Sequence, residues 1–290
     1  MPTPPDAAPA LRATFRVAFG LFLASILFSV AGTLLLNAAP AQAAVALGWI
    51  YDHTGLALND LIKGSTWVYM ALLPVLTFVL YLPVLGLRRS VLFLLWGSAI
   101  GAAAELIGTQ TGFPFGAYAY GDLLGAKMFG HVPWFIPPSW YAMSVVCYDL
   151  AQRLRLSVWG VIATAAAFMV LWDVALDPAM STAFPFWRYE ATGAYFGMPL
   201  VNWLGWLLTS AVIVWGYEKL LGGLDRAVRG ARLLWAANVL FPVFICLAYD
   251  VPWAGVIGLV ALAVPFVLLR MRGDRSAETP RPERREAVAA

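Results

Sequence analysis

Four acidic residues lie inside apolar stretches of this sequence, where an ionisable group is costly and is therefore a candidate for function. They are Glu105, Asp149, Asp173 and Asp177. Asp149 is followed four residues later by Arg153, which is the spacing of a local ion pair, so we assign this pair a structural role. No basic residue lies within helical reach of Glu105. Asp173 and Asp177 share one helix face, just before a proline that is typical of a helix end.

The other three acids could serve as proton donors. Glu105, Asp173 and Asp177 are expected in the last turns of their helices, where the partial negative charge of the helix end disfavours a carboxylate. Burial and a neighbouring acid act in the same direction, and a carboxyl group that stays neutral can donate a proton. The alternative is structural, with hydrogen bonds to backbone groups freed at Pro178 or to side chains of a neighbouring helix. The sequence leaves both interpretations open.

The elements that must position these acids are membrane-spanning helices. The 290 residues are 61% hydrophobic and 12% charged, whereas roughly a quarter of residues are charged in soluble domains. We therefore predict an all-α fold, a polytopic transmembrane helix bundle of about eight helices that occupies residues 1–272 as a single domain. Apolar runs near the ~20 residues that cross a bilayer define the predicted spans: 17–36, 66–87, 90–108, 134–152, 157–176, 199–217, 232–249 and 253–271.

Charge orients this bundle, because basic residues collect on the cytoplasmic side of a membrane. With the N-terminus inside, 16 of the 19 Lys and Arg residues fall in inside segments and three fall outside. Both termini are therefore predicted to be cytoplasmic, in a multi-pass protein of the cell membrane. The first apolar run is longer than a signal-peptide core, so a retained helix is favoured over cleavage. Residues 38–63 are expected along the outer interface, and residues 273–290 in a disordered cytoplasmic tail.

Two outside loops resemble each other. The first contains Thr111-Gly112 and Gly116, the second contains Thr192-Gly193 and Gly197, and each follows a helix with a carboxylate near its outer end. This pattern suggests two related helix–loop–helix units, 90–152 and 157–217.

Other ligand classes find little support in the composition. A formal charge of +3 without a basic patch gives no reason to expect nucleic acid. His53 and His131 are far apart, and Cys147 and Cys246 lie in apolar runs. We therefore predict no metal site, and we interpret the cysteines as buried packing residues.

A set of motifs across residues 90–217 resembles a known family. It comprises Glu105-x-x-Gly108-x-x-Thr111-Gly112-x-Pro114-Phe115-Gly116-x-Tyr118-x-Tyr120, Pro137 and Trp140, Trp172-Asp173-x-x-x-Asp177-Pro178, and Gly193-x-Tyr195-Phe196-Gly197-x-Pro199-x-x-Asn202-x-x-Gly205-Trp206. This combination is similar to the membrane-bound carotenoid biosynthesis proteins of the CruF type. Those are carotenoid 1′,2′-hydratases, with relatives that hydrate C50 carotenoids. The resemblance implies water addition to the terminal double bond of an acyclic carotenoid such as lycopene or γ-carotene.

Hydration of such an alkene suits the acids, because it needs a positioned proton donor, a held water and a pocket that stabilises a tertiary cation. We expect Asp173, the deeper acid, to donate the proton, with Asp177 and Glu105 as supporting catalytic residues. Aromatic faces can stabilise a cation, and Asn202 can hold water. The expected substrate contacts are Trp140, Trp172, Tyr118, Tyr195, Phe115, Trp203 and Asn202.

The expected partners are a carotenoid drawn from the bilayer, membrane lipids and other enzymes of the same pathway, with no cofactor. Three alternatives remain open. A membrane prenyltransferase would use an Asp-x-x-x-Asp motif for Mg²⁺ and diphosphate, but only one such motif occurs, without a cluster of Arg or Lys to hold phosphates. A proton-coupled transporter would use an intramembrane carboxylate as a relay. A carotenoid-binding protein would need no catalysis.

Overall fold

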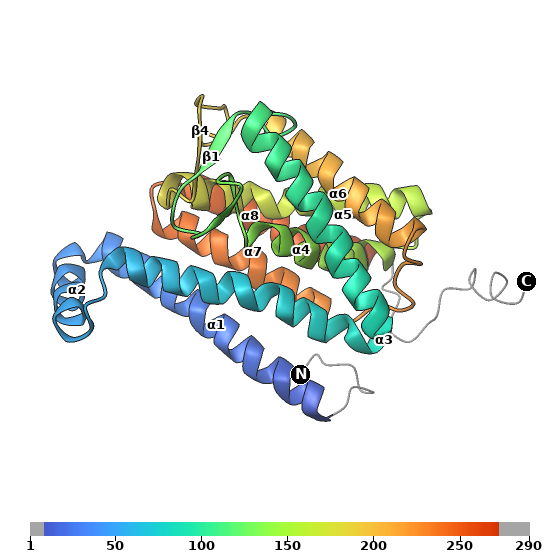
Figure 1. The fold of residues 1–290 in the computed structure, drawn as a ribbon, viewed down its shortest axis with the longest axis horizontal. Helices are drawn as coiled ribbons and strands as arrows, with labels where there is room; N and C mark the ends of the chain where they lie inside the picture. The colour runs from blue at the N-terminus through green and yellow to red at the C-terminus, as the bar shows by residue number, and fades with distance from the viewer. Residues whose placement is uncertain (1–8, 273–290) are drawn as a thin grey trace, which may run out of the picture.

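A computed structural model describes residues 9–272 of the chain, so the predicted disordered tail, residues 273–290, lies outside the described residues. The described part is a bundle of helices with two small β-ribbons at one end (Figure 1). The helices are α1 (Pro9–Ala38), α2 (Pro40–Thr54), α3 (Leu58–Thr111), α4 (Ile136–Gln152), α5 (Val158–Pro178), α6 (Val201–Lys219), α7 (Gly230–Ala248) and α8 (Pro252–Arg272), with a π-helical turn, η1 (Ala179–Ala183), directly after α5. The strands are β1 (Tyr118–Tyr120), β2 (Lys127–Met128), β3 (Val132–Pro133) and β4 (Trp187–Tyr189).

Helix α3 contains two of the predicted spans. Its 54 residues would extend about 80 Å if straight, far beyond the ~30 Å hydrocarbon core of a bilayer. The backbone of Gly86 is left-handed, with φ of 69°, and the helix turns sharply there. Figure 1 shows the two halves diverging from this kink. The predicted spans 66–87 and 90–108 are therefore the two arms of one kinked helix.

The remaining predicted spans correspond to α1, α4, α5, α6, α7 and α8, so the all-α prediction is confirmed. Five of the described helices are long and apolar enough to cross a membrane: α1, α3, α5 with its π-helical turn, α7 and α8. Helix α4 differs from these because nearly every residue along its length is buried by the other helices. It is the central helix of the bundle and contacts other helices along nearly its whole surface.

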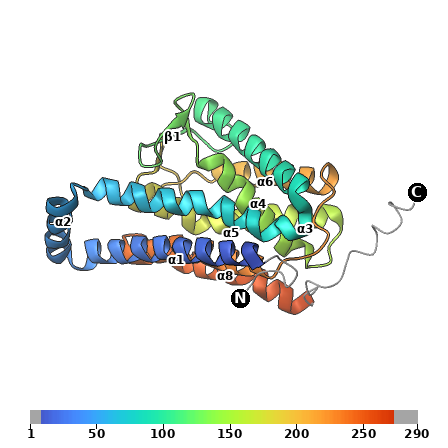
Figure 2. The same cartoon turned by 60° about the horizontal axis from the view of Figure 1, so that its bottom comes forward.

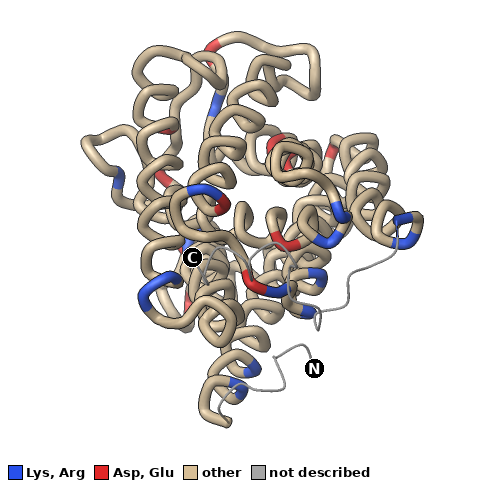
Figure 3. Tube along the Cα trace, turned by 90° about the vertical axis from the view of Figure 1, so that its right-hand side faces the viewer, with Lys and Arg blue, Asp and Glu red and all other residues tan. Residues whose placement is uncertain are grey.

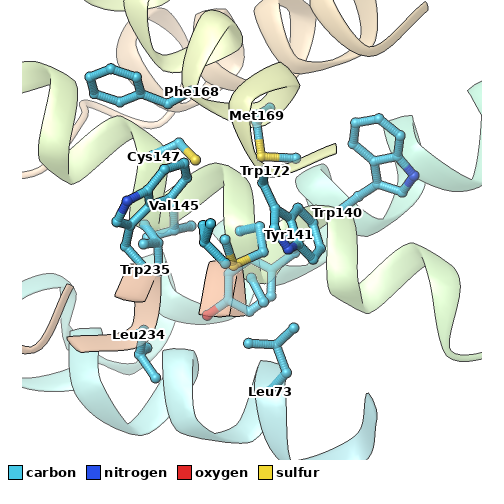
Figure 4. Close-up of a cluster of buried hydrophobic side chains, with 14 of the residues drawn as sticks. Leu73, Trp140, Tyr141, Val145, Cys147, Phe168, Met169, Trp172, Leu234 and Trp235 are labelled. Atoms are coloured by element: carbon cyan, nitrogen blue, oxygen red, sulfur yellow. The ribbon is translucent and has the colours of Figure 1, made fainter. Parts of the chain in front are cut away.

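The core of the bundle forms around α4. Figure 4 shows Tyr141, Val145 and Cys147 of this helix among side chains of α5 and α7, including Met169 and Trp235. The two cysteines, Cys147 and Cys246, are buried and unpaired, as predicted.

Helix α2 lies across the C-terminal end of α1 and the N-terminal end of α3, at one end of the bundle (Figure 2). It occupies the segment that the sequence predicts to be interfacial. One of its faces is exposed, with Val45 at 76% and Trp49 at 62% exposure. An exposed apolar face at this place fits a helix that lies at a membrane interface.

Charge separates the two ends of the bundle. Figure 3 views the end that carries the α3 kink, and Lys and Arg residues are distributed around it. Among the described residues, only Lys63, Lys127 and Arg188 of the basic side chains belong to segments at the opposite end. We refer to this opposite end, where α2 and the β-ribbons lie, as the outer end.

Candidate active site

Glu105 lies in the last two turns of α3, and three hydrogen-bond donors surround its carboxylate. Tyr120 Oη donates to Glu105 Oε2 over 2.8 Å, and Tyr118 Oη donates to the same oxygen. Trp140 Nε1, from α4, donates to Oε1 over 2.9 Å. Only 6% of Glu105 is exposed. Both carboxyl oxygens are therefore occupied by donors that come from a strand and from the central helix.

Asp177 lies at the end of α5 and is held in a similar way. Tyr189 Oη donates to Asp177 Oδ2 over 2.5 Å, and Trp187 Nε1 lies 3.3 Å from the same oxygen. Ser181 Oγ, in the π-helical turn, lies 3.0 Å from Oδ1. Asp177 is almost fully buried. An indole, a phenol and a hydroxyl group thus surround this acid.

The antiparallel ribbon of β1 and β4 connects the two acids. Tyr118 pairs with Tyr189, and Tyr120 pairs with Trp187, across this ribbon. Because alternate residues of a strand point to the same face, these four aromatic side chains share one face of the ribbon. Two of them hold Glu105 and two hold Asp177. A single local structure therefore positions both carboxyl groups at the outer end.

The tyrosines of this ribbon remain protonated donors. Burial, and next the negative charge of Glu105, raises the pKa of Tyr118 and of Tyr120 well above that of an ordinary tyrosine. Burial and the charge of Asp177 raise the pKa of Tyr189 in the same way. Desolvation and a nearby carboxylate both disfavour a phenolate, so the hydroxyl hydrogens stay available to the acids.

Asp173 lies one turn before Asp177 and is fully buried. Asn202 Nδ2, from α6, lies 3.0 Å from Asp173 Oδ2 and 3.4 Å from Asp177 Oδ2, so one amide bridges the two acids. Asp173 Oδ1 has no hydrogen-bond partner among the described protein atoms.

A largely apolar cavity of about 250 Å³ ends at Glu105 and Asp177. Glu105, Asp177 and Asn202 form part of its wall, together with the ribbon residues Tyr118, Tyr120, Trp187 and Tyr189. The cavity extends from there between α1, α2 and the first arm of α3. No Lys or Arg occurs among the described residues that line it. The donors that face the two acids are neutral, and the remainder of the wall is mostly aliphatic and aromatic.

Three tryptophans form an aromatic wall beside the acids. The Trp206 ring lies 4.6 Å from that of Trp140 and 5.7 Å from that of Trp172. Glycine makes room for this wall, because a Cβ atom at Gly101 would lie only 2.7 Å from the Trp140 side chain. A cation formed in this part of the cavity would meet aromatic faces and a carboxylate.

The structure brings most of the predicted site residues to this cavity. Its wall contains Glu105, Asp177, Phe115, Tyr118, Trp140, Trp172 and Asn202. Asp173, Tyr195 and Trp203 are not part of the wall. Asp173 lies behind Asp177, and Tyr195 donates to the backbone oxygen of Val174 on the same helix over 2.8 Å. This geometry favours Asp177 over Asp173 as the acid that meets a ligand.

Four wall residues that contact the acids or the aromatic cluster were not among the predicted site residues: Tyr120, Trp187, Tyr189 and Trp206. A signal for three of them is present in the sequence. Tyr118-x-Tyr120 and Trp187-x-Tyr189 alternate with the period of a strand, so each pair presents two aromatic donors to one side. Strands of three residues are too short to predict with the usual patterns.

The two loops that resemble each other pair through the ribbon of β1 and β4, but they are not structural duplicates. Gly116 and Gly197 both adopt φ of 94°. In the first loop the strand β1 follows the glycine turn, whereas in the second loop β4 precedes it. The order of strand and turn is thus reversed, and the predicted equivalence of units 90–152 and 157–217 does not extend to the loops.

The fold and site define a helical membrane protein in which an apolar cavity leads to paired, buried carboxyl groups. The family model of carotenoid biosynthesis proteins matches residues 65–268, which include α4 to α7 and most of α3 and α8. The chain therefore belongs to this family, and the resemblance found in the sequence is confirmed. It is also 31% identical over 208 residues to the bisanhydrobacterioruberin hydratase of Haloarcula japonica, with 68% of each protein covered. No solved structure matches the chain.

Proposed function

We propose that this protein is a carotenoid hydratase. It adds water across the C1′,C2′ double bond at an acyclic carotenoid end of the lycopene or γ-carotene type and produces a tertiary 1′-hydroxy carotenoid. The observation that carries this proposal is an apolar cavity that ends at two carboxyl groups, Glu105 and Asp177. Similarity to a hydratase of the same family supports water addition over other reactions of carotenoids.

Asp177 is the proposed proton donor. Ser181 Oγ lies 2.8 Å from the backbone oxygen of Asp177 and 3.0 Å from its Oδ1 atom. A hydroxyl group has one hydrogen and can also accept, so when Ser181 donates to the backbone oxygen, its oxygen can accept a hydrogen bond from a protonated Oδ1. The other carboxyl oxygen, Oδ2, accepts from Tyr189, Trp187 and Asn202. This set of partners fits a protonated carboxyl group.

Glu105 is the proposed stabilising anion. All three of its partners can donate a hydrogen bond to it. Trp140 can only donate, because an indole N–H cannot accept a hydrogen bond. An ionised carboxylate satisfies all three donors. Two acids in one cavity thus take different roles because their partners differ.

The reaction then balances without a cofactor. Asp177 transfers its proton to C2′, the π electrons form the new C2′–H bond, and positive charge remains on C1′. The Glu105 carboxylate and the faces of Trp140, Trp172 and Trp206 stabilise this tertiary cation, with about 2 kcal/mol from each desolvated ring that is well placed. Water held by Asn202 bonds to C1′ through its oxygen and returns one proton to Asp177. The net change is the addition of one H₂O.

Pigment analysis tests this proposal directly. Cells that make lycopene and express the chain should accumulate a pigment heavier by one water molecule. Reaction in D₂O should place one deuterium at C2′. Unchanged pigments, with the protein present in the membrane, would refute the hydratase assignment.

The same material separates the alternative functions. Purified protein in detergent should hydrate its carotenoid with a chelator present and without nucleotides. Loss of activity with EDTA and recovery with Mg²⁺ would instead support a prenyltransferase. Bound but unaltered carotenoid would support a carotenoid-binding protein, and proton-coupled uptake of a solute into vesicles would support a transporter.

We further propose that the protein lies in the cell membrane with the outer end away from the cytoplasm. The distribution of basic residues supports this orientation. Ala117 is exposed at this end, whereas Cys147 and Cys246 are buried. A cysteine at Ala117 in a protein without the two native cysteines should react with an impermeant thiol reagent on intact spheroplasts. Labelling only after lysis would reverse the orientation.

A further inference from the structure

The cavity opens at the lipid-facing surface of the bundle, beside α1. Phe28 and Leu35 line the cavity and are also 52% and 39% exposed. A side chain that does both lies at the rim of an opening. At the opposite end of the cavity Glu105 and Asp177 are buried. The site is therefore closed at the acids and open toward the side of the bundle.

Three helices contribute one face each to the walls near this opening. The lining residues of α2 are Ala43, Ala46, Leu47 and Ile50, those of α1 include Ser29, Gly32, Thr33 and Leu36, and those of the first arm of α3 include Leu58, Leu61, Ile62 and Ser65. Each set has the i, i+3, i+4, i+7 spacing of a single helix face. Figure 2 shows α2 lying across the ends of the other two helices. We call this part of the cavity the lateral groove.

Three hydroxyl groups in the lateral groove are already satisfied by their own helices. Ser29 Oγ donates to Ser25 O over 2.9 Å, and Thr33 Oγ1 donates to Ser29 O over 2.8 Å. Ser65 Oγ donates to Ile62 O over 3.1 Å. These hydroxyls present no free donor to a ligand, so the groove offers mainly dispersion contact and apolar burial. Such walls fit a long hydrocarbon and not a polar solute.

We propose that the lateral groove binds the polyene chain of the substrate and admits it from the bilayer. The carotenoid enters with its reacting end first, so that its terminal double bond reaches the acids. This inference rests on the proposed function and adds to it the route and the binding site of the chain. The α1 wall from Phe28 to Leu36 rises about 12 Å at 1.5 Å per residue. A substrate that fills this length gains apolar contact far from the reacting atoms, which positions its end.

A matched pair of glycines on α1 tests the groove. A Cβ atom at Gly32, in the groove, meets nothing within 4 Å, and the same is true at Gly20, which is not part of the lining. Gly32→Phe therefore places a ring in the groove without a clash at its first atom, and Gly20→Phe makes the same change elsewhere on the same helix. With a long carotenoid, Gly32→Phe should lower kcat/KM roughly tenfold or more, whereas Gly20→Phe should stay within about twofold of the wild type.

Substrate length separates a blocked groove from general damage. A short acyclic isoprenoid with the same terminal double bond does not need the groove. Gly32→Phe should therefore lower kcat/KM far less for this substrate than for the long carotenoid. Equal losses for both substrates would overturn the proposal. If Gly32→Phe does not accumulate, Ala46→Leu on α2 narrows the same groove and should show the same dependence on length.

The outcome also distinguishes this proposal from the proposed function. A wild-type protein that hydrates no carotenoid contradicts the hydratase assignment itself. An active wild type together with normal turnover of the long carotenoid by both groove variants would leave hydration intact and refute the lateral groove.

Discussion

Asp149 and Asp177 are both buried acids within helices of one bundle, yet the chain surrounds them with different partners. Asp149, at the inner end of α4, accepts from Arg153 Nε over 2.8 Å, from Tyr81 Oη over 3.0 Å and from the backbone N–H of Val228 over 2.8 Å. The same Arg153 donates to the backbone oxygen of Val228 over 2.7 Å. Asp177 meets neutral donors and faces a cavity.

The difference indicates which buried acids are structural in this protein. A guanidinium beside a carboxylate balances its charge and favours its ionised form. This pair holds both polar backbone groups of Val228 and so fixes the loop between α6 and α7. At the outer end the donors are neutral, and the apolar cavity leaves space for a ligand. The same residue type therefore fixes a loop at one end of the bundle, and at the other end it is the proton donor of the proposed reaction.

The largest expected effect is on turnover at the outer end. Asp177→Asn keeps the size of the side chain and its contacts with Asn202 and Ser181 but cannot deliver a proton. Loss of a general acid costs about 10²- to 10⁴-fold in rate. The variant should accumulate in the membrane and bind carotenoid, with little hydroxylated pigment. Turnover near that of the wild type would exclude Asp177 as the acid and make Asp173→Asn the next variant to measure.

Asp149→Asn is the matched change at the inner end. It removes the negative charge that Arg153 Nε contacts over 2.8 Å, and breaking a buried pair costs about 3–5 kcal/mol of stability. Thermal unfolding in detergent should therefore occur at a lower temperature, while the fraction that stays folded retains its rate per molecule. A large loss of rate per folded molecule, with normal stability, would contradict the division into structural and chemical acids.

A somewhat smaller effect is expected at Glu105, which does not transfer the proton in the proposed reaction. Glu105→Gln removes the negative charge that faces the cation. It also replaces one oxygen that accepts hydrogen bonds with an NH₂ group, which cannot accept from the same donors. Loss of one preorganised electrostatic contact costs on the order of 10²-fold in rate. Asp122→Asn is a suitable control, because Asp122 belongs to the same loop region and its side chain is 94% exposed. An unchanged rate in Glu105→Gln would remove Glu105 from the mechanism.

The sequence predicts the helices well and selects the acids as candidates, because both depend on local signals. Apolar runs of sufficient length identify the spans, and an acid without a nearby base identifies Glu105 and Asp177. The i,i+4 spacing also predicts the ion pair of Asp149 with Arg153, which the structure confirms. The kink at Gly86 falls inside the predicted span 66–87, one residue before its predicted end, and the sequence does not predict that the two spans join in one kinked helix.

The partners of the acids could not be predicted because they come from distant segments. Tyr189 reaches Asp177 through a ribbon whose two strands are separated by 66 residues of chain between their nearest ends, and nothing local in either strand specifies the other. Depth along one helix also does not predict access to the cavity. The sequence predicts Asp173 as the proton donor because it lies deeper, whereas the cavity wall contains Asp177.

A moderate effect is expected from Tyr189→Phe, which removes the phenol that donates to Asp177 over 2.5 Å. A hydrogen bond to a group that becomes charged contributes about 1.5–3 kcal/mol, so the rate should fall roughly 10- to 100-fold. The pH dependence tests the same bond. Because the pKa of Tyr189 is raised above its ordinary value near 10, the phenol is protonated at every lower pH. The wild-type rate should therefore show no loss from phenol ionisation below pH ~10, and an alkaline inflection that disappears in Tyr189→Phe would contradict this.

The smallest effect is expected at Tyr195, which resembles Tyr189 in type but does not face the cavity. Its hydroxyl donates to the backbone oxygen of Val174, and its ring lies 4.7 Å from that of Trp203. Tyr195→Phe should cost about 1 kcal/mol of stability for one neutral hydrogen bond and leave the rate within about twofold of the wild type. Comparison of this variant with Tyr189→Phe tests whether a tyrosine must contact the cavity to affect the rate. A loss of rate at Tyr195 as large as that at Tyr189 would mean that the substrate approaches α5 from the side of Val174, where Asp173 would again become the candidate donor.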